Sequence, residues 1–521
     1  MQKKRLTWWI STALVVLLLA LTGCQAVQGL DIAQAIQNHA SITSAASKGT
    51  LQLELIPKDT SSLTADEKTF IDTMSSVKIA INNANMEDAQ HFSADGALTY
   101  SKGSIPFKLN VDGTKLIIKI DGAPKPIVYD PVTETVSRAV GAVSLLPESI
   151  QNEFGHVINS VQPALVKFLL KNAANPKNIT VTSVSEQVNG ETLALQKAHV
   201  ELDGTELASL LKSLLGSILA DEAGLKELID QLYDALLPVI NAQTDGEASV
   251  FTSLLKNKPL AVKFIFSTVH QALEQVSASL DQGAQAQASA ASPQLQALIN
   301  SKTTLKADYF IDADKQLRKE NLELYMPVAK SDNGVSALKL TLTNEIWNIN
   351  KPVKADLIDV SGGVLNFGIK PSSLYSLLGQ LDKSSALYKL LKEDMRVTKR
   401  QIQLQLSEEA AADDSDTPHP FINADGVTMV PVRFISEQLG ADVKWNGDLK
   451  QVTIKDALTG TTIVLTLDDK NASVNGSASQ LESAATLHNS STFVPVRFIA
   501  ENLGSKVEFD NDTRVVTIKR D

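Results

Sequence analysis

A sequence repeat near the C-terminus constrains the fold of this chain more than any other feature. Residues 430–455 recur as residues 494–519, sixty-four positions later and without a gap, and fifteen of the twenty-six aligned residues are identical. A repeat of this kind folds twice into one supersecondary unit, and each unit needs a neighbour to cover its apolar side. The sequence therefore predicts a C-terminal module built from two similar halves.

Each copy combines a short helix with a β-hairpin. Pro431 and Pro495 stand where a helix can begin without losing a backbone donor, and Gly440 and Gly504 suit the left-handed conformation that ends one. The apolar side of the helices is predicted to contain Phe434, Ile435 and Leu439, and in the second copy Phe498, Ile499 and Leu503. Alternating apolar residues then flank polar turns at 446–448 and 510–512. The expected module has two β-hairpin-plus-short-helix repeats and belongs to the α+β class.

The motif V-P-V-R-F-I-x-E-x-L-G-x-x-V-x-[WF] occurs in both copies. It closely resembles the copper amine oxidase N-terminal-like, or stalk, domain found in envelope proteins of Gram-positive bacteria. The resemblance implies a leading strand, which residues 400–406 can provide, and it places the acidic stretch 407–416 in a loop inside the module. The module is therefore expected to span residues 394–521.

The N-terminus has the pattern of a lipoprotein signal peptide. Cationic residues 3–5 precede an apolar stretch of about fourteen residues, which is shorter than the roughly twenty that a spanning helix needs. The tetrapeptide Leu21–Cys24 follows and resembles a bacterial lipobox, whose cysteine receives acyl chains such as palmitate and becomes the first mature residue. Residues 1–23 are therefore predicted to be removed, and Cys24, the only cysteine of the chain, to carry a durable two-chain anchor.

The predicted anchor places the chain at the cell membrane, on its extracytoplasmic face. Its first partner is then the membrane, reached through lipid on Cys24. A formal net charge of −11 argues against nucleic acid as a partner, because binding to nucleic acid depends on neutralising phosphates with lysine and arginine. Cell-wall polymer and other envelope proteins are the remaining partner classes.

The middle part, residues 24–393, mixes strand and helix patterns. A helix is expected over residues 31–45. Alternating apolar residues predict strands over 51–56, 77–81, 92–100, 105–111 and 115–120, and again over 304–311, 317–326 and 338–347. Leucines spaced by three and four predict amphipathic helices over 157–170, 206–219, 223–240 and 269–280. Asp112-Gly113 and the segment 312–316 are expected to form hairpin turns.

Neither half-apolar strands nor amphipathic helices can cover their apolar side alone. The expected assembly is a curved antiparallel sheet with packed helices, again of the α+β class. The order of elements, with a late hairpin carrying the text I-D-x-x-K-x-L-x-K, resembles the open half-barrel of the LolA and LppX lipoproteins. The leucines of residues 206–219 and 223–240 then form either a core against the sheet or the lining of a ligand groove.

No catalytic residue, metal ligand or cofactor is predicted. The seven histidines lie far apart, without an H-x-H or H-E-x-x-H pair that would fix a metal from one element. Asp312 with Asp314, and Asp510 with Asp512, lack the downstream glycine and glutamate of a calcium loop, so we interpret them as hairpin turns. The resemblance is to the accessory domain of the oxidases, and no segment has the length and pattern of their catalytic domain.

Arg433 and Arg497 are the candidate binding residues. Each stands beside an aromatic residue in both copies, and a guanidinium group can fork onto carboxylate or phosphate groups of a wall polymer. A structural interpretation competes with this one, because Glu437 and Glu501 stand four residues further on, where a helix pairs them with the arginines.

The sequence thus favours a membrane-anchored, non-catalytic binding or scaffold protein of the cell envelope. An alternative is a carrier for a lipid or other apolar ligand, bound in a groove of the middle domain. An enzyme of unknown type is the third hypothesis.

Overall fold

The computed structural model describes residues 27–58, 61, 63–113, 115–129, 161–242, 256–282, 293–328, 334–367, 371–406, 420–488 and 491–521. Cys24, the predicted signal peptide and the acidic stretch 407–416 lie outside the described residues. The chain divides into two compact units. One contains the residues up to Ile118 together with Asp130–Ile358, and the other contains Lys119–Tyr129 together with Asp359–Asp521.

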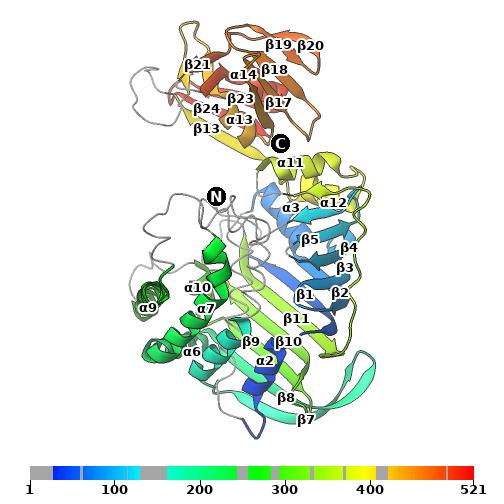
Figure 1. The fold of residues 1–521 in the computed structure, drawn as a ribbon. Helices are drawn as coiled ribbons and strands as arrows, with labels where there is room; N and C mark the ends of the chain where they lie inside the picture. Colours follow the sequence, from blue (N-terminus) through cyan, green and yellow to red (C-terminus); the bar gives the residue numbers. More distant parts are fainter. Residues whose placement is uncertain are drawn as a thin grey trace. The chain divides into compact units, whose positions relative to one another are not determined.

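The first unit is built on a twisted antiparallel sheet (Figure 1). Its strands are β1 (Ala45–Pro57), β2 (Ser76–Met86), β3 (His91–Tyr100), β4 (Gly103–Asp112), β5 (Lys115–Ile120), β7 (Ile179–Val188), β8 (Glu191–Asp203), β9 (Thr304–Ile311), β10 (Leu317–Pro327) and β11 (Val335–Trp347). They lie in the order β5-β4-β3-β2-β1-β11-β10-β9-β8-β7. The pairing of β1 with β11 joins distant parts of the chain, such as Thr50 and Thr343, which are 293 residues apart.

Side chains alternate between two faces of this sheet, as the period of two in a strand requires. One side is the apolar face, where residues directly opposite one another form rows. One row contains Leu322, Leu342, Leu51 and Ile79, and the next contains Leu324, Leu340, Leu53 and Val77. The other side carries ion pairs such as Lys339–Glu323, at 3.0 Å, and a small buried cluster at β7–β9 that contains Leu195 and Phe310. The alternation predicted for these strands is confirmed.

Helices of the first unit pack against the apolar face and against one another. They are α2 (Ile32–Ala40), α3 (Ala65–Met74), α6 (Gly204–Ala220), α7 (Glu222–Ala242), α9 (Lys258–Gln282) and α10 (Pro293–Leu298). Helix α2 contacts β10 and α6 contacts β8 (Figure 1). A core between them buries Ile32, Leu207 and Leu305. The leucines of the predicted helices 206–219 and 223–240 contribute to this core and to a second one between helices, where Leu214 and Leu225 are buried.

Two local predictions for the first unit need correction, and one hairpin was missed. Helix α2 ends at Ala40, five residues early, because Thr43 and Ser44 bond to Asn350 and Lys351 and direct the chain into β1. Helix α9 begins at Lys258, eleven residues before the predicted start. The hairpin of β7 and β8 was not predicted, although it turns on Asn189-Gly190, both with positive φ, which is a favoured hairpin turn.

The second unit contains three sheets, with strand orders β13-β24-β23, β14-β15-β22-β21 and β16-β17-β18-β19-β20, and a parallel pair, β6 with β12. Its strands are β6 (Ile127–Tyr129), β12 (Leu365–Asn366), β13 (Arg400–Gln405), β14 (Phe421–Ile422), β15 (Thr428–Pro431), β16 (Asp442–Asn446), β17 (Gln451–Lys455), β18 (Thr462–Thr466), β19 (Asn471–Val474), β20 (Ser477–Gln480), β21 (Thr486–His488), β22 (Ser491–Pro495), β23 (Ser505–Asp510) and β24 (Val515–Arg520). Its helices are α11 (Pro371–Gln380), α12 (Ala386–Lys389), the π-helical turn η4 (Leu390–Asp394), α13 (Val432–Gln438) and α14 (Val496–Asn502). The predicted leading strand is β13, which pairs with β24.

The two copies of the repeat pair with each other about a local two-fold relation. Strands β15 and β22 are antiparallel, and Val430 lies directly opposite its repeat equivalent Val494. Each strand leads into a helix, α13 or α14, and then into a hairpin, β16–β17 or β23–β24. One core shared by both copies buries Ile435 and Ile499 completely. The predicted α+β module of two helix-and-hairpin repeats is therefore confirmed.

The predicted ends of the repeat helices agree with the structure, whereas one core residue does not. Pro431 and Pro495 directly precede the first helical residues, and Gly440 and Gly504 have φ of 87° and 74°. Phe434 was assigned to the apolar side of its helix but is 48% exposed. The buried stripe of α13 runs through Val432, Ile435 and Leu439, and Phe434 lies off that stripe.

None of the helices among the described residues combines the length and the apolar character that crossing a membrane requires.

Candidate functional site

The two predicted binding arginines occupy equivalent positions on the surface of the C-terminal module. Helices α13 and α14 place Arg433 and Arg497 in their first turns, and each side chain is 58% exposed. Arg433 lies 3.3 Å from Glu437, and Arg497 lies 3.7 Å from Glu501. Exposed pairs of this kind contribute little to stability, so both guanidinium groups can exchange their glutamate for another acidic group at small cost.

Each copy of the repeat also carries an exposed aromatic residue. The Arg433 guanidinium donates to the carbonyl oxygen of Val443 at 3.3 Å, and Trp445 lies two residues further along β16, on the same side of that strand. Trp445 is 46% exposed, and Phe509, its equivalent in the second copy, is 43% exposed. Each copy thus exposes one arginine and one aromatic ring, the residue types in which binding surfaces are enriched.

Sequence analysis did not predict the exposure of these rings, because Trp445 and Phe509 belong to the alternating apolar residues that flank the two turns. Each ring directly precedes the turn of its hairpin, Trp445 before residues 446–448 and Phe509 before residues 510–512. The sequence did contain a signal of this exposure. Both copies carry a large aromatic residue at this repeat position, and neither carries an aliphatic one.

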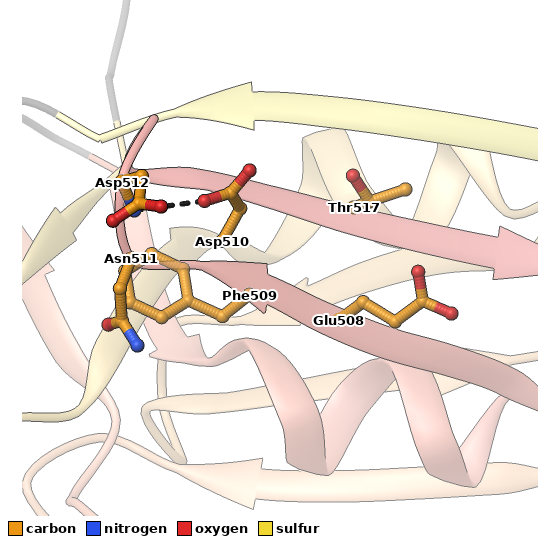
Figure 2. A pocket seen from close by; sticks show the side chains of 6 residues that line it. All are labelled: Glu508, Phe509, Asp510, Asn511, Asp512 and Thr517. Carbon is orange, nitrogen blue, oxygen red and sulfur yellow. Dashed lines mark hydrogen bonds between the residues drawn. The ribbon is translucent and has the colours of Figure 1, made fainter.

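A shallow depression lies at the end of the second hairpin, lined by Glu508, Phe509, Asp510, Asn511, Asp512 and Thr517 (Figure 2). The Asp510 carboxylate accepts the backbone N–H groups of Asp512 and Thr513, at 2.9 and 3.2 Å. These hydrogen bonds, with the largest effect from Thr513, lower the pKa of Asp510. Glu508 pairs with Lys519 at 2.6 Å. The acids thus stabilise the turn, as the hairpin interpretation predicts.

The second acidic pair, Asp312 and Asp314, also lies in a hairpin turn that its carboxylate stabilises. The Asp312 carboxylate accepts the backbone N–H groups of Asp314 and Gln316 and pairs with Arg318 at 3.1 Å. Across the described ranges, no group of three histidine, cysteine, aspartate or glutamate residues is placed to hold a metal ion.

Comparison with known proteins adds one finding. Residues 412–518 match the family model described as copper amine oxidase N-terminal domain. The match covers both copies of the repeat, and it is to the N-terminal domain of that oxidase family, in agreement with the resemblance recognised from the repeated text. No curated protein matches the chain.

Proposed function

We propose that this chain, whose C-terminal module is a copper amine oxidase N-terminal domain, is a membrane-anchored lipoprotein outside the cytoplasm and a non-catalytic binding or scaffold protein of the cell envelope. The observation that carries the anchor is the lipobox that ends in Cys24. The occurrence of an exposed arginine and an exposed aromatic ring in both copies supports a binding role for the module. A polymer with repeated acidic groups can occupy both copies at once, which raises its overall affinity without new contacts.

The anchor is tested by replacing Cys24 with alanine. Without the thiol there is no acylation site, so the protein is expected to leave the membrane fraction or to remain unprocessed. Cell fractionation and mass spectrometry of the mature N-terminus measure both effects. An unmodified cysteine in the parent protein, or a mature chain that begins at another residue, contradicts the proposal.

The binding role is tested by replacing both Arg433 and Arg497 with glutamine in the full chain. Since each arginine would donate charge-assisted hydrogen bonds, binding to purified cell wall is expected to weaken by about tenfold or more. Lys455→Gln together with Lys519→Gln is the matched control, because it removes the same charge from equivalent positions of the two copies. Equal binding by all three proteins rules out recognition through the arginines.

A further inference from the structure

Three polar side chains interrupt the apolar face of the first unit. Tyr309 on β9, Glu320 on β10 and Asn344 on β11 lie directly opposite one another in a single row. The rows beside them contain leucine and isoleucine, as in Leu322, Leu342, Leu51 and Ile79. A carboxyl, a phenol and an amide thus share one place on an otherwise hydrophobic surface.

These polar groups are poorly satisfied by the described part of the protein. Tyr309 is 3% exposed, and its hydroxyl has no hydrogen-bond partner among the described residues. The Asn344 amide donates to Glu320 Oε1 at 3.3 Å, and no ion pair joins Glu320 to any described cation. Arg318, two residues earlier on β10, is paired with Asp312. Buried polar groups without partners cost free energy, so a site that keeps them implies a use for them.

The sheet is distorted at this row. The register shifts between Ser47 and Gly49, between Ile81 and Asn83, and between Leu317 and Lys319, all next to the row. The same row contains Gly49, where a Cβ atom would lie 2.4 Å from the carbonyl oxygen of Thr343. Bulges of this kind bend strands and redirect side chains, and they recur beside functional sites.

The surroundings of the row can accommodate an alkyl chain. Leu51, Ile79, Leu324, Leu340 and Leu342 on the apolar face are only partly buried, so water still reaches them. Contact with an apolar chain would remove this remaining surface from water, which is favourable.

We propose that the apolar face binds an amphiphile with a primary amine head, whose ammonium group is held by Glu320, Tyr309 and Asn344. An ammonium group has three donors and no acceptor. The Glu320 carboxylate, the Tyr309 phenol oxygen and the Asn344 amide oxygen are three acceptors from three adjacent strands. The positive charge compensates the carboxylate, and the alkyl chain lies on the partly buried leucines. This site goes beyond the proposed envelope function and does not depend on it.

Because an ammonium group pairs with the ionised form of Glu320, the pKa of this carboxyl group sets the pH dependence of amine binding. Burial raises the pKa of Glu320, and the hydrogen bond from Asn344 opposes the shift in part. Burial also raises the pKa of Tyr309, so the phenol keeps its proton. Of the helices packed on β10, α10 has no titratable residue. Helix α2 carries His39, and its N-cap residue Asp31 lies 3.7 Å from Lys315. Amine binding should therefore strengthen as pH rises through the pKa of Glu320.

The test uses decylamine, below its micelle concentration, with the purified chain from residue 25 onward, which lacks both the acylation site and the apolar stretch before it, so that no detergent is needed. Titration calorimetry at pH 8 is expected to show binding at least about tenfold tighter than for decanol or decanoate, the difference expected for a charge-assisted hydrogen bond. The affinity for decylamine should fall as the pH is lowered from 8 through the raised pKa of Glu320, whereas that for decanol should not. Absence of decylamine binding, or equal affinity for all three compounds, overturns the proposal.

Glu320→Gln should abolish the preference for the amine. Glu323→Gln is the matched control, because it removes the same charge from the same strand on the opposite face, where Glu323 pairs with Lys339. Retained preference in Glu320→Gln, or its equal loss in Glu323→Gln, overturns the assignment.

Stability separates a binding role of Glu320 from a structural one. A carboxyl whose pKa is raised by folding binds its proton more tightly in the folded state, so the parent loses stability as pH rises from the unfolded value, about 4.3, through the folded pKa. Glu320→Gln lacks that loss and should unfold at pH 8 in at least as much urea as the parent. If Glu320→Gln unfolds in less urea than the parent, a second variant, Tyr309→Phe, tests the site, because it removes only the hydroxyl and keeps the ring. A several-fold loss of amine affinity in Tyr309→Phe supports the site, and unchanged affinity overturns it.

Discussion

Replacing either Asp456 or Arg520 with alanine is expected to destabilise the second unit by about 3–5 kcal/mol, because it leaves the other charge buried without its partner. The two side chains are 0% and 2% exposed, and Nη2 of Arg520 lies 2.5 Å from Oδ2 of Asp456. They occupy the same position of the two copies, sixty-four residues apart. An ion pair between equivalent positions is complementary only because one copy carries the acid and the other the base.

Further contacts hold this pair in place. Arg520 donates to the carbonyl oxygen of Leu439, and its guanidinium group lies 5.2 Å from the centre of the Tyr375 ring. Asp456 accepts the backbone N–H of Leu458 at 3.0 Å and the hydroxyl of Thr459 at 2.8 Å. The pair therefore connects both copies with α11, so we expect its loss to affect the whole unit.

Urea unfolding of the full chain, with hydrogen exchange of peptides from β17 and β18 as the local probe, measures this effect. Arg433→Ala is the matched control, since it breaks an exposed arginine–glutamate pair and should cost less than about 1 kcal/mol. The double variant Asp456→Leu with Arg520→Met should cost less than the sum of the two alanine variants, because it leaves no charge behind. A loss below about 1 kcal/mol for each alanine variant contradicts the argument.

Gly440→Ala should cost about 2–4 kcal/mol, whereas the equivalent change Gly504→Ala should cost about 1 kcal/mol. Both glycines have positive φ, 87° and 74°, which an alanine adopts at a cost of roughly 1 kcal/mol. At Gly440 a Cβ atom would also lie 2.4 Å from the ring of Tyr375, whereas at Gly504 no atom of the described residues, apart from its chain neighbours, lies within 4 Å. Forcing a methyl group against a packed ring adds about 1–3 kcal/mol.

Tyr375 cannot easily yield to this methyl group. Its ring is completely buried, and its hydroxyl donates to the carbonyl oxygen of Thr398 at 3.2 Å. The change in urea midpoint is measured for both glycine variants at the same probe peptides. Because both variants pay the cost of positive φ, the difference between them reports the contact of the methyl group with Tyr375. Equal destabilisation of both variants would show that Tyr375 moves aside.

Local patterns predicted most of the individual elements. The spacing of Pro431 and Gly440 fixed the ends of α13, because φ preferences act within a few residues. Period-two alternation predicted β9, β10 and β11, since each strand has one covered side. The unpredicted β7–β8 hairpin carried an equally local signal in Asn189-Gly190.

Among the candidate binding residues, too, some contacts were predictable from nearby residues in the sequence and others were not. The pairing of Arg433 with Glu437 follows from helical spacing and was expected from sequence. The interruption at Glu320 was also visible, as an acid in the period-two series that continues with Leu322, Leu324 and Met326. The sequence could not show that Tyr309 and Asn344 lie beside Glu320, because they belong to other strands.

By itself, then, the sequence determined the repeat, its helix and hairpin, and the alternation of the strands, all of which depend on residues close along the chain. Only the tertiary structure decided that β1 closes against β11, that Asp456 meets Arg520, and that Tyr309, Glu320 and Asn344 share a row. The reason is register: strands separated by hundreds of residues can pair in many alignments that satisfy the same alternation. A slip of one residue would turn every side chain to the other face, and a slip of two would keep the faces but change every neighbour.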